Sequence, residues 1–192
     1  STDSTRTILQ SFSDPRIRLI HNDANLGLTK SLNKGMAQAR GDFIARMGAD
    51  DIALPHRLAT QMKYLAEHQD IVLAGSWVEV VGEGRINRIA MPPADPRVVE
   101  YEFMLGNCMY HSSVMFRKHA IMQAGGYNEE YRYAQDFELY SRLIPQLSIS
   151  NIPEVLMRFR IHPHSVTATS ESQKIANANT LRIIRSNMER LV

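Results

Sequence analysis

The sequence is poor in several features that define whole classes of proteins. It has one cysteine among 192 residues, so no disulfide can form within the chain. The protein therefore suits a reducing compartment or is indifferent to redox state. No apolar run approaches the roughly 20 residues that a membrane-spanning helix needs, and no signal peptide is visible. The formal charge is only +2, whereas nucleic-acid-binding proteins normally carry a concentrated basic face. We therefore expect no nucleic-acid partner.

The remaining composition is that of an ordinary globular protein. Hydrophobic residues make up 44% of the chain and charged residues 22%, which argues against disorder. A chain of this length can bury a sizeable core and is most economically one domain. It contains no internal repeat and no low-complexity linker.

Segments with strand character alternate with segments of helical periodicity along most of the chain. Strands are expected at residues 16–22, 42–47, 70–82, 112–117 and 154–162, with a turn and short return strand at 82–89. Helices are expected at residues 28–40, 55–65, 96–105, 118–126 and 136–144, and from about residue 170 onward. This alternation indicates an α/β fold with a largely parallel central sheet.

Apolar residues recur at helical spacing in three of these helices, and each set predicts a buried face. The sets are Leu28, Leu32 and Met36; Leu58, Met62 and Leu65; and Leu181, Ile184, Met188 and Leu191. Gly41 is expected to close the first helix in a left-handed conformation, and Gly125 with Gly126 to end the helix at 118–126. Asp95 and Pro96 form a cap and first-turn signal for the helix that follows them.

The stretch "RMGADDIALPHR" places Asp50 and Asp51 directly after an expected strand. In an α/β sheet, ligands gather at the carboxyl ends of the strands. Two carboxylates there can hold Mg²⁺, which proteins usually bind through one or two carboxylates plus the phosphate oxygens of a substrate. The alternative is that the pair forms a turn and caps the next helix, and the local pattern does not separate the two.

Five stretches in a fixed order resemble the family 2 glycosyltransferases of the A-type (GT-A) fold. They are "NLGLTKSLNKGMAQARGDFIARMGADD", "LPHRL", "HSSVMFRK", "GGYNEEYRYAQDFELYSRL" and "NIPEVLMRFRIHPHSVT". The resemblance covers the chain from Ser1 to about Thr169 and implies a three-layer sandwich around a mostly parallel sheet. It implies a nucleotide-sugar half at residues 1–94, an acceptor and catalytic-base half at 95–169, and a C-terminal amphipathic helix at 170–192.

The resemblance also implies roles for acidic residues. In the family, an Asp-x-Asp motif at the end of a strand binds the metal and the diphosphate of a nucleotide sugar, which assigns metal binding to Asp50 and substrate binding to Asp51. A later aspartate in a Glu-Asp or Gln-Asp pair is the catalytic base, which assigns that role to Asp136 beside Gln135, a substrate-binding residue. For Asp136 the alternative is a plain helix N-cap. The implied cofactor is a divalent cation, Mn²⁺ or Mg²⁺.

Three other residues carry weaker implications. His162 resembles a histidine that completes the metal or phosphate site, and the alternative is an exposed loop histidine. His111 is expected to face the donor or acceptor sugar, or else to be a hydrogen-bonded structural histidine. Arg160 approaches phosphate, or pairs with a surface carboxylate. We expect His164 to be solvent-exposed and Cys108 to be a small buried side chain.

The chain departs from the family pattern in two places. Gly48 stands where the family usually has an aspartate, so we expect weakened metal binding, and Gly48→Asp should tighten binding of metal and nucleotide. The segment "STDST" follows a strand, a helix and a second strand in relatives. We expect that this unit is absent and the chain N-terminally truncated, which could leave the chain itself inactive.

The implied chemistry needs two acidic sites. A cation neutralises charge on the departing diphosphate, and a carboxylate takes the proton of the attacking hydroxyl, with inversion at the anomeric carbon. The expected function is transfer of a sugar from a nucleotide-diphosphate sugar to a saccharide or lipid-linked acceptor in bacterial surface polysaccharide synthesis. The alternatives are a non-catalytic carbohydrate-binding or interaction module that retains the fold and, less favoured, a phosphatase or phosphotransfer domain.

Expectations about location and assembly are less specific. The resemblance places the protein in the cytoplasm, at the inner face of the plasma membrane. The apolar stripe of the C-terminal helix, with Arg182, Arg185 and Arg190 nearby, has three possible uses. It could pack on the domain, join a second subunit in a homodimer, or make peripheral contact with an anionic membrane surface. We favour the first two.

Overall fold

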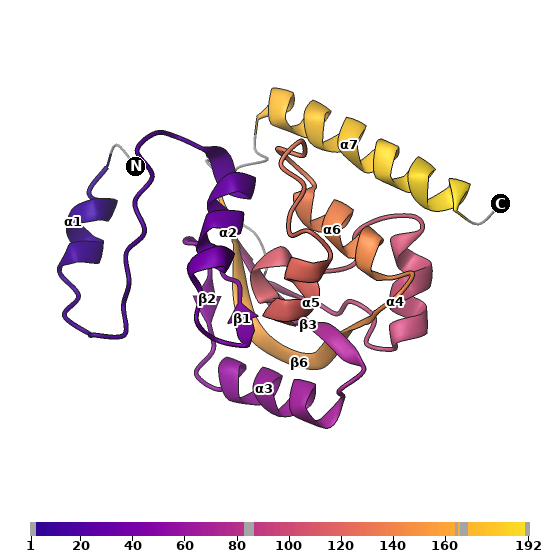
Figure 1. Cartoon of the computed structure of the whole chain (residues 1–192), viewed down its shortest axis with the longest axis horizontal. Coiled ribbons are helices and arrows are strands. Elements are labelled where there is room, and N and C mark those ends of the chain that lie inside the picture. Colours follow the sequence, from indigo (N-terminus) through magenta and orange to yellow (C-terminus); the bar gives the residue numbers. More distant parts are fainter. Residues whose placement is uncertain (1–2, 83–86, 164, 166–168, 191–192) are drawn as a thin grey trace.

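The computed structural model describes residues 3–82, 87–163, 165 and 169–190, and its centre is a six-stranded sheet (Figure 1). The strands are β1 (Phe43–Ala45), β2 (Ile52–Ala53), β3 (Ile71–Gly82), β4 (Arg88–Ala90), β5 (Met115–Arg117) and β6 (Ser148–Ile161). Their order is β1-β5-β3-β6-β2, with β4 paired to β3. The strands at 42–47, 70–82, 112–117 and 154–162 are confirmed, although Ser112 and Ser113 belong to a 3₁₀ turn. The short return strand is found as β4, and residues 83–86 of the turn before it lie outside the described residues.

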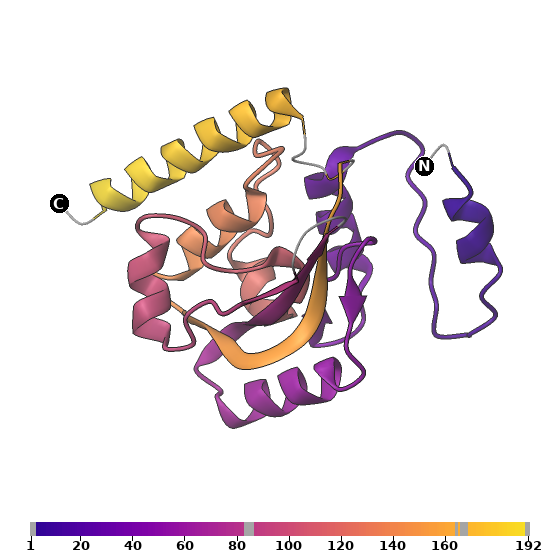
Figure 2. The same ribbon diagram turned by 180° about the vertical axis from the view of Figure 1, so that it is seen from behind.

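The sheet is mixed, so the expectation of a largely parallel sheet is wrong. Among the described pairings, β3 and β6 are parallel, whereas β1/β5, β2/β6, β3/β4 and β3/β5 are antiparallel. The two long strands β3 and β6 run together along most of their length, and β6 bends strongly around the sheet (Figure 2). The short strands complete the sheet at its margins.

Helices cover both faces of the sheet, which gives the expected three layers. The helical elements are α1 (Thr5–Gln10), α2 (Gly27–Gln38), α3 (Arg57–Glu67), α4 (Pro96–Phe103), η1 (His111–Ser113), α5 (Lys118–Gln123), α6 (Gln135–Leu143) and α7 (Ser170–Glu189). One face packs against α3 through Leu65. The larger core lies on the other face, under α2, α4, α5 and α6, with α7 outermost (Figure 1). Within the described residues, no helix is both long and apolar enough to span a bilayer.

The predicted apolar face of α3 is confirmed for Leu65 and wrong for the other two residues. Leu58 and Met62 are 57% and 41% exposed, whereas the buried residues of the helix are Arg57, Gln61 and Leu65. Arg57 Nη2 donates to the carbonyl of Arg46 at 2.7 Å, and Gln61 Nε2 donates to the carbonyl of Ser113 at 2.8 Å. Buried backbone carbonyls need hydrogen-bond donors. The side chains of Arg57 and Gln61 supply these donors, and for this reason they face the sheet.

The stripe predicted on α7 is also wrong in part. Leu181 and Met188 are exposed, Ile184 packs against the core, and Leu191 lies outside the described residues. The buried contacts come from Ile183 and from Asn187, whose Nδ2 donates to the carbonyl of Phe103 at 2.8 Å. The helix thus packs on the domain, as favoured above.

Three helix ends show where local signals succeed and fail. Asp95 caps α4, accepting from the backbone N–H of Arg97 at 2.8 Å, and Gly125 and Gly126 have φ of +85° and +69° after α5, so both predictions are confirmed. Gly41 does not close α2 in a left-handed conformation, because the chain already turns extended at Ala39, with φ −64° and ψ 139°. On α2, Met36 is buried, Leu32 is partly buried and Leu28 is exposed.

Residues 16–22 are not a strand, contrary to expectation. They carry no strand assignment, their side chains are exposed, and the segment stands away from the body of the protein (Figure 1). A strand needs a neighbour to share its backbone hydrogen bonds, and no described strand lies beside this segment. Strand propensity without a partner strand is therefore not enough to form a strand, and the end of the segment is held by Lys34 of α2, which donates to the carbonyl of His21 at 2.8 Å.

Candidate active site

The loop between β1 and β2 carries the adjacent aspartates. Asp51 is buried, and its Oδ1 accepts a hydrogen bond at 3.0 Å from the backbone N–H of Arg160 on β6. This bond ties the loop to the end of β6, next to His162. His162 Nε2 consequently lies 3.0 Å from Asp50 Oδ2. The two residues predicted to bind metal are thus side by side, although 112 positions separate them in the sequence.

His162 and Asp50 bond each other directly, and a carboxylate and an imidazole are both groups that bind divalent cations. In the part of the chain that is described, no group of three or more His, Cys, Asp or Glu side chains could hold a metal ion. A cation here would therefore need its remaining ligands from a bound diphosphate and from water.

Gly48 lies against both carboxylates. A Cβ atom at this position would come 2.5 Å from Asp51 Oδ2 and 2.8 Å from Asp50 Oδ1, closer than atoms pack. It would also lie 3.1 Å from Ser112 Oγ. The observed arrangement of the two carboxylates thus depends on the glycine, and an aspartate would fit only after both side chains turn away.

Asp136 is the second residue of α6 and not its N-cap. The cap position belongs to Ala134, which adopts a left-handed conformation with φ +58° and makes no side-chain cap bond, so the plain N-cap alternative is wrong. Asp136 is half-buried. Burial raises the pKa of its carboxyl, while the backbone N–H groups of Phe137 and Asp136, Asn107 and Arg46 act in the opposite direction. A carboxylate with a raised pKa is suited to accept a proton.

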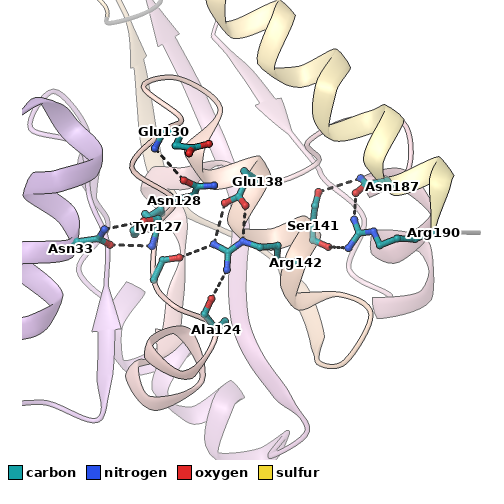
Figure 3. Close-up of polar contacts among 11 residues, drawn as sticks. Asn33, Ala124, Tyr127, Asn128, Glu130, Glu138, Ser141, Arg142, Asn187 and Arg190 are labelled. Carbon is teal, nitrogen blue, oxygen red and sulfur yellow. Dashed lines mark hydrogen bonds and ion pairs between the residues drawn. The ribbon is translucent and has the colours of Figure 1, made fainter.

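Arg142 fixes the start of α6 relative to the preceding turn (Figure 3). Its guanidinium makes two hydrogen bonds to Glu138, at 2.6 and 3.0 Å, and donates to the carbonyl of Gly126 at 2.7 Å and to that of Ala124. The ion pair with Glu138 lies within α6 and orients the guanidinium, while the two carbonyl bonds join α6 to the turn after α5.

His111 lies on the same wall and is held by Tyr127. Burial, with a smaller contribution from Arg46, holds the pKa of His111 well below its usual value, and burial raises the pKa of Tyr127. The imidazole is consequently neutral at pH 7 and the phenol keeps its proton, and His111 Nε2 and the Tyr127 hydroxyl share a hydrogen bond at 2.7 Å. Asn33 of α2 holds the backbone N–H and carbonyl of Tyr127 at 3.0 and 2.9 Å (Figure 3). His111 is thus both hydrogen-bonded and part of the site.

These side chains line one cavity of about 320 Å³. The predicted site residues among its lining are Asp50, Asp51, His111, Gln135, Asp136 and Arg160, and His162 adjoins it through Asp50. The lining draws on both halves proposed for the chain, residues 1–94 and 95–169, which remain a prediction. The structure therefore brings the site residues predicted from the sequence together around one cavity.

Two residues of the site were missed from the sequence. Arg46, at the end of β1, lines the cavity, donates to Ser112 Oγ and makes no ion pair within the described residues. Asn107, in the loop between α4 and η1, donates from Nδ2 to Asp136 Oδ2 at 2.8 Å. Arg46 directly precedes the "MGADD" stretch, so its position was a usable signal. Asn107 carried none, because only the fold brings it to Asp136.

The remaining predictions have mixed outcomes. Among the described residues, the Arg160 side chain has no carboxylate partner, which disfavours the surface ion pair; Arg158 pairs with Glu79 at 2.7 Å instead. Burial raises the pKa of the Cys108 thiol to about 12, so this half-buried side chain is protonated and unreactive. His164 lies outside the described residues.

Comparison with known proteins identifies the class to which this fold and site belong. The sequence profile of glycosyl transferase family 2 matches residues 1–126, and the chain belongs to this family. An uncharacterized glycosyltransferase of Haemophilus influenzae is 29% identical over 98% of this chain and 61% of its own length. The amylovoran biosynthesis glycosyltransferase AmsE of Erwinia amylovora is 33% identical over 72% of this chain and 52% of its own.

A relative with a defined reaction is similar at the same level. The UDP-Gal:alpha-D-GlcNAc-diphosphoundecaprenol beta-1,3-galactosyltransferase of Escherichia coli is 29% identical over 72% of this chain and 50% of its own length. The chain thus spans between half and about three fifths of the length of these relatives.

Solved structures confirm the GT-A fold. Staphylococcus aureus TarS 1–349 in complex with UDP-GlcNAc superposes with a TM-score of 0.73 and 16% identity, covering 97% of this chain and 54% of TarS. The mannosyltransferase PcManGT of Pyrobaculum calidifontis, in complex with GDP-Man and Mn²⁺, has a TM-score of 0.67 and 15% identity, covering 99% of this chain and 52% of its own. At these identities, the likeness shows the fold.

Proposed function

We propose that this glycosyltransferase chain transfers a sugar, with inversion, from a nucleotide-diphosphate sugar to a hydroxyl of a saccharide or lipid-linked acceptor. The observation that carries the proposal is that one cavity is lined both by Asp50, which contacts His162 at 3.0 Å, and by the half-buried Asp136. Sugar transfer needs charge neutralisation at the leaving diphosphate and a base at the acceptor hydroxyl. The cavity supplies residues for both tasks.

The diphosphate end is formed by Asp50, His162 and Arg46. Asp50 and His162 would hold the divalent cation, which when bound neutralises charge on the leaving diphosphate. Arg46 presents a guanidinium without a described carboxylate partner, and guanidinium groups bind phosphate oxygens through charge-assisted hydrogen bonds. Arg160, which lines the same cavity and whose backbone N–H donates to Asp51, is the second phosphate-binding candidate.

The acceptor end is formed by Asp136 and His111. Asp136 takes the proton of the attacking hydroxyl, and its raised pKa makes it a stronger base than an exposed carboxylate. Because Tyr127 holds Nε2 of the neutral His111, the other ring nitrogen is the one proposed to hydrogen-bond a sugar hydroxyl. Gln135, one position before the base, is the further substrate-binding residue proposed here.

The names of relatives support the choice of substrates. TarS has been solved with UDP-GlcNAc, and the E. coli relative is named for a diphosphoundecaprenol-linked acceptor. AmsE is named for biosynthesis of a polysaccharide. We extend the proposal to bacterial surface polysaccharide synthesis at the cytoplasmic face of the membrane, because a lipid-linked acceptor resides in a bilayer.

The proposal is tested by ligand-dependent thermal stabilisation. The melting temperature of the full chain is measured with Mn²⁺ and a panel of UDP, GDP and dTDP sugars, for the wild type and for Asp50→Asn. We expect one nucleotide class to raise the melting temperature in the presence of Mn²⁺, and Asp50→Asn to remove most of that increase. A non-catalytic carbohydrate-binding module would show no nucleotide-dependent stabilisation with any member of the panel, and that result would overturn the proposal.

A further inference from the structure

We propose that Asn107 is a positioning residue for Asp136. In this role its side-chain amide holds one oxygen of the carboxylate and leaves the other for the acceptor hydroxyl. The inference rests on the proposed function, because it assumes that Asp136 is the base. No sequence motif pointed to Asn107, which precedes the "HSS" turn by four residues and Asp136 by 29.

Two hydrogen bonds fix the orientation of the Asn107 amide. Its Nδ2 donates to Asp136 Oδ2 at 2.8 Å, and its Oδ1 accepts from the backbone N–H of Met109 at 3.0 Å. Met109 is buried in the main core and also lines the cavity. Asn107 itself is exposed, so its amide is oriented by these two bonds and not by packing, and the bond to Met109 N–H leaves its donor facing Asp136. A flipped amide would lose both hydrogen bonds.

The other groups that face Asp136 cannot replace this contact. Arg46 acts on the carboxylate through its charge, and Tyr127 and Tyr140 are neutral phenols whose pKa values burial raises. The backbone N–H groups of Asp136 and Phe137 also favour the ionised carboxyl, but they belong to α6 itself. Among the described residues, Asn107 provides the side-chain hydrogen bond to Asp136 from another element.

The contact has two consequences for a catalytic base. A donor to one carboxylate oxygen fixes the rotamer, so the second oxygen points in one direction. A donor also stabilises the ionised form and opposes the effect of burial, which keeps Asp136 deprotonated over a wider pH range. If Asn107 acted only structurally, through its bond to Met109, it would affect the rotamer of Asp136 only indirectly and would not change the pKa of Asp136.

Two substitutions separate the two hydrogen bonds of Asn107. Asn107→Asp keeps an oxygen for the Met109 N–H but replaces the donor to Asp136 with a second carboxylate. Asn107→Leu has a similar shape and removes both bonds. Asn128→Asp is the matched control, because Asn128 makes the same kind of bond, to the backbone N–H of Glu130 at 3.1 Å, and the charge change is equal.

The measurement is the pH dependence of kcat and kcat/KM for the full chain, with folding checked by thermal denaturation. Ionised Asp136 is the active form, so activity falls as pH drops through its pKa. We expect the acidic limb to move to higher pH in Asn107→Leu and further in Asn107→Asp, because a neighbouring negative charge raises the pKa of Asp136 more than loss of a donor does. We also expect kcat at the optimum to fall about tenfold, with a smaller change in KM for the donor. Asn128→Asp should keep the wild-type profile.

The outcomes distinguish this inference from the function on which it rests. If Asp136→Asn is as active as the wild type, the assignment of the base fails. If Asp136→Asn is inactive but Asn107→Asp leaves the acidic limb in place, only the positioning role is overturned. If Asn107→Asp has no activity at any pH, titration of the ¹³C-labelled Asp136 carboxyl by NMR replaces the kinetic readout. An unchanged Asp136 pKa in that titration would then contradict the inference.

Discussion

At the scale of single residues, Gly48 shows why the aspartate motif is unusual in this chain. The space that a Cβ would need is filled by Asp50 Oδ1 and Asp51 Oδ2. The glycine therefore allows two carboxylates to lie against the backbone, in place of the further carboxylate that the family resemblance leads us to expect at this position. Gly48→Asp can tighten binding of metal and nucleotide only if the side chains of Asp50 and Asp51 are displaced.

We predict opposite effects of Gly48→Asp without and with metal. Without metal, steric conflict and a third neighbouring negative charge should lower the free energy of unfolding by about 1–3 kcal/mol. With Mn²⁺ and nucleoside diphosphate, the added carboxylate should make the ligand-dependent rise in melting temperature larger than in the wild type. Thermal denaturation of both proteins with and without ligand checks this, and equal ligand-dependent rises would show that the motif is misplaced.

Arg46 is the residue on which the diphosphate assignment depends most. Arg46→Gln removes a charge-assisted hydrogen bond worth roughly 1.5–3 kcal/mol, so the Kd for a nucleoside diphosphate should rise about tenfold or more. Arg185→Gln is the control, because Arg185 is exposed on α7 and pairs with Glu189 at 2.8 Å. Titration calorimetry in the presence of Mn²⁺ measures both. An unchanged Kd in Arg46→Gln would remove Arg46 from the phosphate site.

The residues that could be predicted from the sequence are those whose roles follow from local motifs. Asp50 and Asp136 each stand at a recognisable junction of strand or helix, and the family resemblance names them. Asn107 could not be predicted, since its partner lies 29 residues away and neither residue carries a signal of the other. Contacts between loops become visible only when the fold is known.

At the scale of helices and strands, α3 shows the limit of hydrophobic periodicity. Its spacing placed Leu58 and Met62 inward, yet Arg57 and Gln61 are buried because their donors satisfy carbonyls at Arg46 and Ser113. Burial lowers the pKa of Arg57 to about 10, which still leaves it charged at neutral pH. Hydrophobic periodicity is read from apolar residues alone and does not reveal which buried backbone carbonyls need a hydrogen-bond donor.

The burial of Arg57 and the exposure of Leu58 predict that, on α3, loss of the charged side chain destabilises the protein more than loss of the apolar one. Arg57→Ala should lower the free energy of unfolding by about 3 kcal/mol, because it leaves buried carbonyls without donors. Leu58→Ala, one residue along the same helix, should change it by less than about 1 kcal/mol, since Leu58 is 57% exposed. Urea denaturation of the two variants measures both values. A larger loss in Leu58→Ala would restore the face predicted by periodicity.

At the scale of the whole molecule, the α/β fold class could be predicted from the sequence, but the strand directions in the sheet could not. Alternating elements correctly indicated an α/β protein, and solved structures confirm the GT-A fold. Strand direction was predicted wrongly, because hydrophobic pattern does not record which neighbour a strand pairs with, and the short strands β1, β2, β4 and β5 pair in antiparallel fashion. Residues 16–22 have strand composition without a described partner strand.

The proposed function depends most on Asp136, which lines the cavity and is hydrogen-bonded by Asn107. The most direct test compares the wild type with Asp136→Asn, measuring sugar transfer and Mn²⁺-nucleotide stabilisation in the same preparations. Loss of the general base should reduce kcat by about 10²–10⁴-fold and leave the nucleotide-dependent rise in melting temperature intact, because Asp136 is not a predicted metal ligand. Undiminished transfer by Asp136→Asn would contradict the account.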